Sequence, residues 1–171
     1  MIKNNKKDGD HMNKKDGAWA IIYCPEEDSI LLGRRSNYVN NAGLWNHFGG
    51  KLNNGEPPKQ GLIRELYEET KISTAHNKII TQQGEALQKL GCITHQENRH
   101  CHFYLITVQA EIAPKLNHEH SDFFWFQRNH LPKNINTPTR LSKKIKLSSK
   151  HTSYYGATPS SPLYNSKRLF T

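Results

Sequence analysis

Three carboxylates gather in one short stretch of an otherwise basic chain. The segment 64–69, Arg-Glu-Leu-Tyr-Glu-Glu, holds three glutamates, whereas the whole chain has 24 Lys and Arg against 15 Asp and Glu and a net charge of +9. Glu65 and Glu69 are four residues apart, and like charges at that spacing destabilise a helix. Such a cluster becomes favourable when a divalent cation lies among the carboxylates, and a site with only oxygen ligands favours Mg²⁺ or Mn²⁺ over zinc. The segment is therefore a candidate metal site.

Residues 57–70 are predicted to form the helix that carries these glutamates. Pro57 and Pro58 suit the first turn of a helix, and Glu56 just before them suits the positive end of the helix dipole. At 100° per residue, an apolar stripe is expected to pack while the glutamates project together from the other face. The predicted packed set is Leu62, Ile63, Leu66, Tyr67 and Thr70, and the projecting set is Glu65, Glu68 and Glu69. A simpler alternative is a solvated charged face, although such faces usually interleave charges of both signs.

Through this segment the chain resembles the Nudix family. Gly50, five residues, Glu56, seven residues and then the run 64–72 (RELYEETKI) is similar to the Nudix box G-x5-E-x7-R-E-U-x-E-E-x-G-U, where U is aliphatic. Only the last glycine of the box differs, because Lys71 stands there. Upstream, residues 30–35 (ILLGRR) and 47–51 (HFGGK) are similar to the MutT branch, which usually has F-P-G-G-K. The resemblance covers roughly residues 17–130.

The resemblance implies a fold, a reaction and roles for individual residues. The implied fold is α/β, a Nudix-type α/β/α sandwich with a mixed sheet. The implied reaction is metal-dependent hydrolysis of a nucleoside diphosphate linked to another moiety, and Mg²⁺ (or Mn²⁺) suits it by neutralising phosphate charge and activating water. The implied metal ligands are Glu65, Glu68, Glu69 and the main-chain carbonyl of Gly50; Glu65 and Glu68 would also be catalytic, and Glu56 and Arg64 would form a structural ion pair.

Lys71 is expected to end the helix. Glycine there would serve as a C-terminal capping residue with positive φ. Lysine in that conformation costs on the order of 1 kcal/mol. The departure from the box is therefore predicted to lower stability without removing a metal ligand.

Residues outside the helix complete the predicted site. By its spacing, Arg35 matches the phosphate-contacting arginine of the MutT branch, and Lys51, directly after the double glycine, is a further candidate for substrate binding. Glu119 in a polar loop is the candidate general base, with Glu97 as its rival. Trp45 offers an aromatic surface for a nucleobase. The simpler alternatives are a surface arginine, solvated loop carboxylates and a core aromatic residue.

The remaining sequence predicts one domain of residues 17–147 between a flexible N-terminal leader (1–16) and a C-terminal extension (148–171). The leader carries the segment NKKDG twice, and the extension is rich in Ser, Tyr and Pro. Around the glutamate helix, alternating and apolar runs predict strands in a mixed sheet. The expected elements are a hairpin of 18–24 with 29–35, a short extended piece at 44–51, β-rich runs at 78–95 and 100–112, a strand within 121–132 and a basic amphipathic helix within 139–149.

Composition narrows the function classes. No apolar run approaches the roughly 18 residues that cross a bilayer, and no apolar stretch follows the basic N-terminus as in a secretory signal. A cytoplasmic protein without a membrane partner is therefore expected. The three cysteines form no CxxC pair, so a zinc site built from Cys92, His95 and residues 100–102 is the weaker interpretation.

The basic charge favours a polyanionic partner. The expected substrate is a nucleoside triphosphate, oxidised forms included, cleaved to monophosphate and pyrophosphate. An alternative within enzymes is a dinucleoside-polyphosphate or RNA-cap hydrolase, in which RNA would be the partner. An alternative from another class is a catalytically silent ligand sensor with the same fold, although the complete set of box carboxylates disfavours it. The sequence leaves the oligomeric state open.

Overall fold

A computed structural model describes residues 16–73, 79–80, 87–95, 99–145 and 147. Residues 1–15 and 148–171 lie outside the described residues, so the predicted leader and extension are not addressed by the structure. Glu97, the rival general base, also lies outside them. In the part of the chain that the structure describes, no helix is long and apolar enough to cross a membrane.

The centre of the sheet is the predicted hairpin. Strands β1 (Gly17–Cys24) and β2 (Ser29–Arg35) pair antiparallel from Ile22↔Leu31 to Cys24↔Ser29, as expected. All eight residues of β1 are buried, because the strand is covered on both faces and flanked on both edges. On one edge it pairs in parallel with β7 (Arg99–Val108). This parallel pair makes the sheet mixed, as predicted.

The segment between β2 and α1 brings the double glycine into the sheet. Strand β4 (Phe48–Lys51) pairs with the first half of β1, from Gly17↔Lys51 to Ala20↔Phe48. Strand β3 (Trp45–Asn46) pairs with the end of β2. The outer strands are β5 (Ile79–Ile80) and β6 (Gln88–His95) beside β7, and β8 (His120–Gln127) beside β2. Gly49 and Gly50 therefore lie against the central strand rather than in a free loop.

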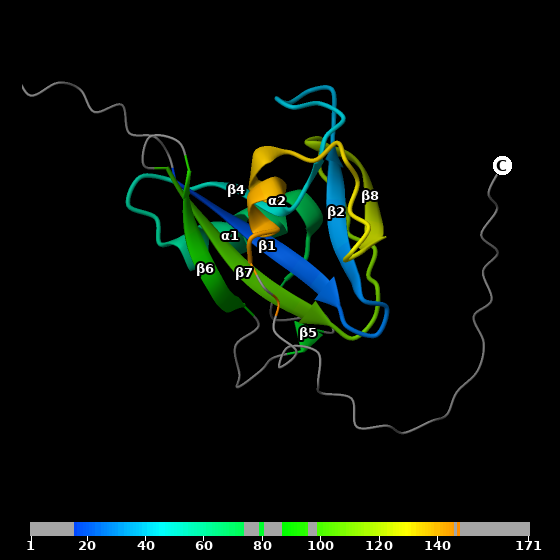
Figure 1. The fold of residues 1–171 in the computed structure, drawn as a ribbon. Helices are drawn as coiled ribbons and strands as arrows, with labels where there is room; N and C mark the ends of the chain where they lie inside the picture. Colours follow the sequence, from blue (N-terminus) through cyan, green and yellow to red (C-terminus); the bar gives the residue numbers. More distant parts are fainter. Residues whose placement is uncertain (1–15, 74–78, 81–86, 96–98, 146, 148–171) are drawn as a thin grey trace, which may run out of the picture.

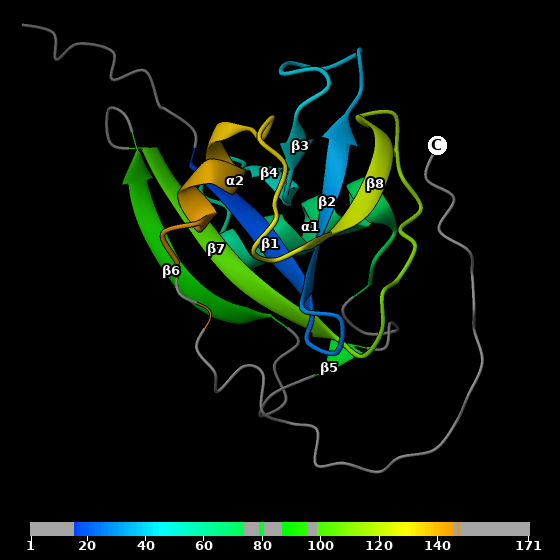
Figure 2. The same ribbon diagram turned by 45° about the vertical axis from the view of Figure 1, so that its right-hand side comes forward.

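The two helices lie on opposite faces of the sheet (Figures 1 and 2). Helix α1 (Pro58–Thr70) packs its leucines into one cluster with Ala18, Ala20 and Ile22 of β1. The alternate residues of β1 point to the other face, where Trp19 packs with Leu141 of helix α2 (Thr137–Ser142). This arrangement confirms the predicted α/β/α sandwich.

Helix α2 is shorter than the segment predicted for it. It begins at Thr137, because the Asn136 side chain caps it by accepting a hydrogen bond from the Thr139 amide, and it ends at Ser142. Lys143 and Lys144 fall in the turns that follow. A basic amphipathic helix through 139–149 is therefore wrong for the described residues.

The packed stripe of α1 differs from the predicted one. Leu62 and Leu66 are fully buried, but Ile63 is 39% and Tyr67 55% exposed. Glu69, predicted to project outward, is only 2% exposed. At 100° per residue Glu69 lies about 20° from Leu62 and about 60° from Leu66, whereas Ile63 and Tyr67 lie about 100° and about 140° from Leu62. The helix turns its two leucines to the sheet, and Glu69 turns inward with them.

Helix α1 ends at Lys71 in the left-handed conformation that the box glycine would favour. Its φ is 57°, and its amide donates to the Tyr67 carbonyl. The ammonium group of Lys71 lies 4.8 Å from the centre of the Tyr67 ring, which offsets part of the conformational cost.

Replacing Lys71 with glycine is expected to raise the free energy of unfolding by about 0.5–1 kcal/mol, since glycine adopts positive φ without a steric penalty. Urea unfolding measures this change, and kcat should stay unchanged. Lys71→Ala is the matched control: it loses the ring contact and keeps the backbone cost, so it should be no more stable than the parent chain. A glycine variant less stable than the parent would contradict the argument.

Candidate active site

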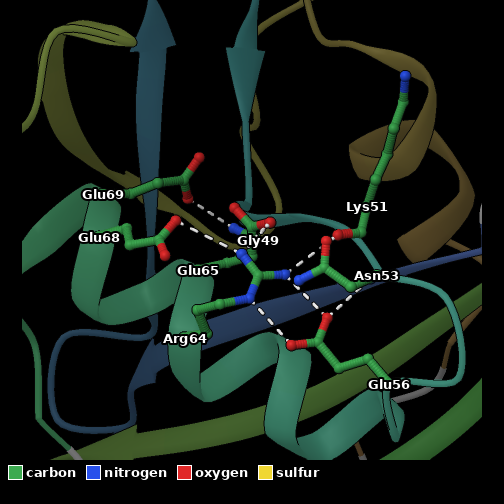
Figure 3. A network of polar contacts seen from close by, with 8 residues as sticks. All are labelled: Gly49, Lys51, Asn53, Glu56, Arg64, Glu65, Glu68 and Glu69. Atoms are coloured by element: carbon green, nitrogen blue, oxygen red, sulfur yellow. Dashed lines mark hydrogen bonds and ion pairs between the residues drawn. The ribbon is translucent and has the colours of Figure 1, made fainter.

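The predicted ion pair between Glu56 and Arg64 closes the loop after β4 onto α1 (Figure 3). Both nitrogens of one edge of the Arg64 guanidinium bind the Glu56 carboxylate, each at 2.9 Å. The same carboxylate accepts the amide of Asn53 at 2.8 Å, and Arg64 also reaches the carbonyl of Lys51 at 3.3 Å. These contacts with Arg64 lower the pKa of Glu56 to about 2. Glu56 therefore stays charged and holds the loop in place.

Arg64 also touches two of the three box glutamates. Its remaining terminal nitrogen lies 2.8 Å from Glu65 and 3.4 Å from Glu68 (Figure 3). Glu68 is the exposed member, with 54% of its side chain open to solvent, whereas Glu65 has 17%. Burial raises the pKa of Glu65 despite its contact with Arg64.

Glu69 lies deepest. One of its oxygens accepts the Gly49 amide at 2.7 Å. Burial raises the pKa of Glu69 well above its ordinary value, and the negative charges of Glu65 and Glu119 raise it further. Glu65 and Glu69 therefore both have a raised pKa, so their charged forms are disfavoured. A cation bound between them would stabilise the charged forms.

Gly50 makes room for the Glu65 carboxylate. A Cβ at position 50 would lie 2.7–2.8 Å from the carboxyl atoms of Glu65, so only glycine leaves that space. Two of the predicted metal ligands, the Gly50 carbonyl and the Glu65 carboxylate, therefore belong to residues that are close to each other in the structure. The neighbouring Gly49 has φ of 127°, a conformation that favours glycine.

The structure brings Glu119 to this site from a distant part of the chain. The loop before β8 donates the amides of Lys115 and Asn117 to the carbonyls of Thr70 and Glu69 at the end of α1. These carbonyls have no partner within the helix, so the loop completes the helix end. The negative charge of Glu119 contributes to raising the pKa of both Glu65 and Glu69, after burial. The predicted general base therefore lies near the carboxylates.

Arg35 reaches the same region from the end of β2. A β-bulge between Arg34 and Arg35 changes the pairing register with β8 there. Arg35 donates to the Asn40 carbonyl at 2.7 Å and lies 4.0 Å from the Glu119 carboxylate, and its positive charge partly opposes the raised pKa of Glu69. Its neighbour Arg34 is exposed, whereas Arg35 is half-buried.

Two further predicted residues are not drawn into the cluster. The Lys51 side chain is exposed and extends away from the glutamates, as Figure 3 shows. Trp45 is half-buried and packs edge-on against Phe126, with ring centres 4.9 Å apart. Its cluster, which includes Ile21 and Leu32, lies on the α2 face, opposite the glutamates. Substrate binding by Lys51 and Trp45 stays a prediction.

The donor set fits a hard divalent cation in its chemistry. It offers only carboxylate and carbonyl oxygens, which hard cations prefer. Burial disfavours the charged forms of Glu65 and Glu69, which a cation would stabilise, and Gly50 has no side chain to fill the space beside Glu65. As the side chains lie, however, no three His, Cys, Asp or Glu residues of the described chain are arranged around one ion position. Glu65 and Glu68 contact Arg64 instead, so binding an ion between them requires side-chain rotation.

Sequence reasoning missed His120, which follows the candidate base. Its ring is buried against Phe48, and its Nδ1 lies 4.0 Å from the free oxygen of Glu69. Burial lowers the pKa of His120 to about 4, so the ring is neutral at pH 7. Only its position next to Glu119 could have drawn attention to it in the sequence.

A family model and two curated relatives match this chain. The model of the NUDIX domain matches residues 14–145. The chain is 26% identical over 113 residues to dihydroneopterin triphosphate diphosphatase of Haemophilus influenzae, covering 61% of this chain and 69% of that protein. It is 31% identical over 99 residues to CTP pyrophosphohydrolase of Escherichia coli, covering 58% and 67%.

A solved structure shares the fold. The MutT NUDIX hydrolase from Burkholderia pseudomallei aligns with a TM-score of 0.55 and 24% identity, over 77% of this chain and 96% of that one. The family match spans most of the chain and includes the whole box, and the curated relatives are hydrolases of pyrophosphate bonds. This chain therefore belongs to the Nudix family and is a hydrolase that acts on pyrophosphate bonds.

Proposed function

We propose that this enzyme is a Mg²⁺- or Mn²⁺-dependent pyrophosphohydrolase that converts nucleoside triphosphates, oxidised forms included, to the monophosphate and pyrophosphate. The observation that carries the proposal is the close approach of Glu65 to Gly50, with Glu68 and Glu69 on the same helix and Glu119 held near them by the end of α1. A substrate with several negative phosphates needs cations in such an acidic site, and the carboxylates provide the ligands for them.

In this proposal the carboxylates of Glu65, Glu68 and Glu69 and the carbonyl of Gly50 hold the divalent ions. When bound, the ions would neutralise phosphate oxygens and make water more nucleophilic. Arg64 braces the ligands, because it holds Glu56 on one edge and contacts Glu65 and Glu68 on the other. We propose that Glu65 and Glu68 are also catalytic, as the family resemblance implies.

Glu119 is the proposed general base. About a third of its side chain is exposed, and its backbone is fixed because its carbonyl accepts the Ser36 amide at 2.8 Å. Arg35, 4.0 Å away, is proposed to bind a substrate phosphate and to orient the Glu119 carboxylate. Lys51, exposed beside the loop that Glu56 and Arg64 hold, would add positive charge at the rim. Trp45 is left out of the proposed substrate contacts, because its ring packs on the other face of the sheet.

The curated relatives support the substrate class. Their names refer to dihydroneopterin triphosphate and CTP, and both compounds carry a triphosphate on a heterocycle-bearing group. We therefore place nucleoside triphosphates ahead of dinucleoside polyphosphates and capped RNA, which remain arms of the test.

A nucleotide panel with Mg²⁺ tests the proposal, and Glu68→Gln is the diagnostic variant. Wild-type enzyme should release pyrophosphate from one or more nucleoside triphosphates, and EDTA should stop the reaction. Glu68→Gln should lower kcat by at least about 10²-fold, since it weakens ion binding at an exposed position without disturbing the core. Exposed Glu26→Gln, in the β1–β2 turn, should match wild type. Cleavage of diadenosine tetraphosphate or capped RNA alone would contradict the assigned substrate class, and no metal-dependent turnover would contradict the proposed activity.

A further inference from the structure

His120 is a buried polar side chain without a partner. Its side chain has no exposed surface, and neither ring nitrogen has a hydrogen-bond partner among the described residues. Buried polar groups in folded proteins are nearly always hydrogen-bonded, because an unpaired one loses its bonds to water without replacement. An imidazole kept in this state calls for a functional reason.

The packing around His120 fixes the ring in place. The ring lies against Phe48, with centroids 4.9 Å apart and planes inclined by 58°. In the adjacent strand, a Cβ at Gly33 would lie 2.6 Å from the His120 ring and 2.7 Å from the Phe48 ring. A glycine inside β2 therefore opens the slot that the imidazole fills.

The ring faces the least exposed of the proposed metal ligands. Nδ1 of His120 lies 4.0 Å from one oxygen of Glu69, while the other oxygen accepts the Gly49 amide at 2.7 Å. Figure 3 shows this second hydrogen bond, with the first oxygen directed away from Gly49. One side of the carboxylate is thus fixed, and the side that lacks a donor points towards the imidazole.

We propose that His120 is a positioning residue for Glu69. A rotation of the Glu69 carboxylate that shortens the 4.0 Å separation to about 2.8 Å lets Nδ1–H donate to it. The carboxylate is then held between Gly49 and His120, in the orientation that an ion needs. Partners of this kind orient metal ligands, and removing them typically costs 10–100-fold in metal affinity or activity. The inference rests on the proposed metal site.

A purely structural role for the ring predicts different variant behaviour. If His120 only fills its slot, phenylalanine should replace it well, because the slot is lined by Gly33 and Phe48. If its Nδ1 matters, asparagine should work better, since its amide nitrogen takes nearly the same position, although its smaller size leaves a void. The two substitutions therefore separate packing from hydrogen bonding.

The experiment measures Mn²⁺ binding by the EPR signal of free Mn²⁺, and the melting temperature in EDTA, on the full chain. His120→Phe is expected to raise the Mn²⁺ dissociation constant about 10-fold or more while melting close to wild type. His120→Asn is expected to melt lower but to bind Mn²⁺ within about 3-fold of wild type. His120→Leu replaces the phenylalanine variant if that one does not fold.

Unchanged Mn²⁺ affinity in His120→Phe would overturn the inference, as would equal loss of affinity in the phenylalanine and asparagine variants. Absence of Mn²⁺ binding by the wild-type chain is a separate outcome. It would overturn the proposed metal site, and the role of His120 with it.

Discussion

Replacing Glu69 with glutamine is expected to lower kcat by about 10³-fold while making the folded chain more stable in EDTA at pH 8. The first effect follows from the loss of a charged ligand in a site where ion electrostatics supply several kcal/mol. The second follows from burial, because Glu69 is 2% exposed and has one strong hydrogen bond, to the Gly49 amide. A glutamine oxygen can accept the same hydrogen bond without carrying a charge into the core.

The raised pKa of Glu69 also predicts the direction in which the stability of the wild-type chain changes with pH. The folded pKa of Glu69 is raised well above its ordinary value of 4.5, so above that value the folded chain binds more protons than the unfolded chain. In EDTA, wild-type stability should therefore fall as the pH rises from about 4.5 through the folded pKa. Glu69→Gln should show a smaller fall, and Glu65, whose pKa is also raised, should account for part of the remainder.

Thermal melts between pH 5 and pH 8, with and without Mg²⁺, measure this prediction. Exposed Glu26→Gln serves as the control and should change neither the melting temperature nor kcat. A Glu69→Gln variant that melts below wild type at pH 8 in EDTA would show that the buried carboxylate stabilises the fold. That result would reverse the argument.

Alanine substitutions at the two adjacent glycines are expected to have different effects, one on activity and the other on stability. Gly50→Ala should fold but lower kcat by about 10²–10³-fold, because the new Cβ would lie 2.7 Å from the Glu65 carboxyl group, which can move only by leaving its place beside Gly50. The backbone of Gly50 is not in a glycine-specific conformation, so the substitution adds no backbone strain there.

Gly49→Ala should instead destabilise the fold by about 3 kcal/mol or more. Its φ is 127°, and a Cβ would collide with the Ala18 carbonyl oxygen and approach the Trp19 Cα to 2.8 Å. These are backbone atoms of the central strand, which cannot move without breaking the β1–β4 pairing. Chemical denaturation and steady-state kinetics on both variants separate the two cases. A stable, active Gly50→Ala enzyme would remove Gly50 from the proposed site.

Local spacing made much of the candidate site predictable. The interval between Glu56 and Arg64 is short, and a helix that starts at the prolines places Arg64, Glu65 and Glu68 at fixed angles to one another. The hairpin and the mixed sheet were likewise expected, since alternation and apolar runs mark strands whose neighbours are close in sequence. The positive φ of Lys71 was also predictable, because the end of the helix requires that conformation whatever residue stands there.

Contacts between distant segments decided the rest. Helical periodicity places Glu69 beside Leu62 and Leu66, but it could not show the Gly49 amide of β4, 20 residues away in the sequence, that binds the buried carboxylate. Glu119 was one of two loop carboxylates in the sequence, and only the hydrogen bonds between its loop and the end of α1 bring it to the cluster.

Trp45 and His120 illustrate the same limit. The sequence placed Trp45 beside the double glycine, yet strand alternation and Phe126 take its ring to the other face of the sheet. His120 had no local signal for its contact with Glu69, because Gly33, Phe48 and β8 build its slot from three separate strands. The sequence by itself determined which carboxylates share one helix. The tertiary structure decided which of them is buried and what surrounds it, because burial and long-range hydrogen bonds arise only when distant strands pack together.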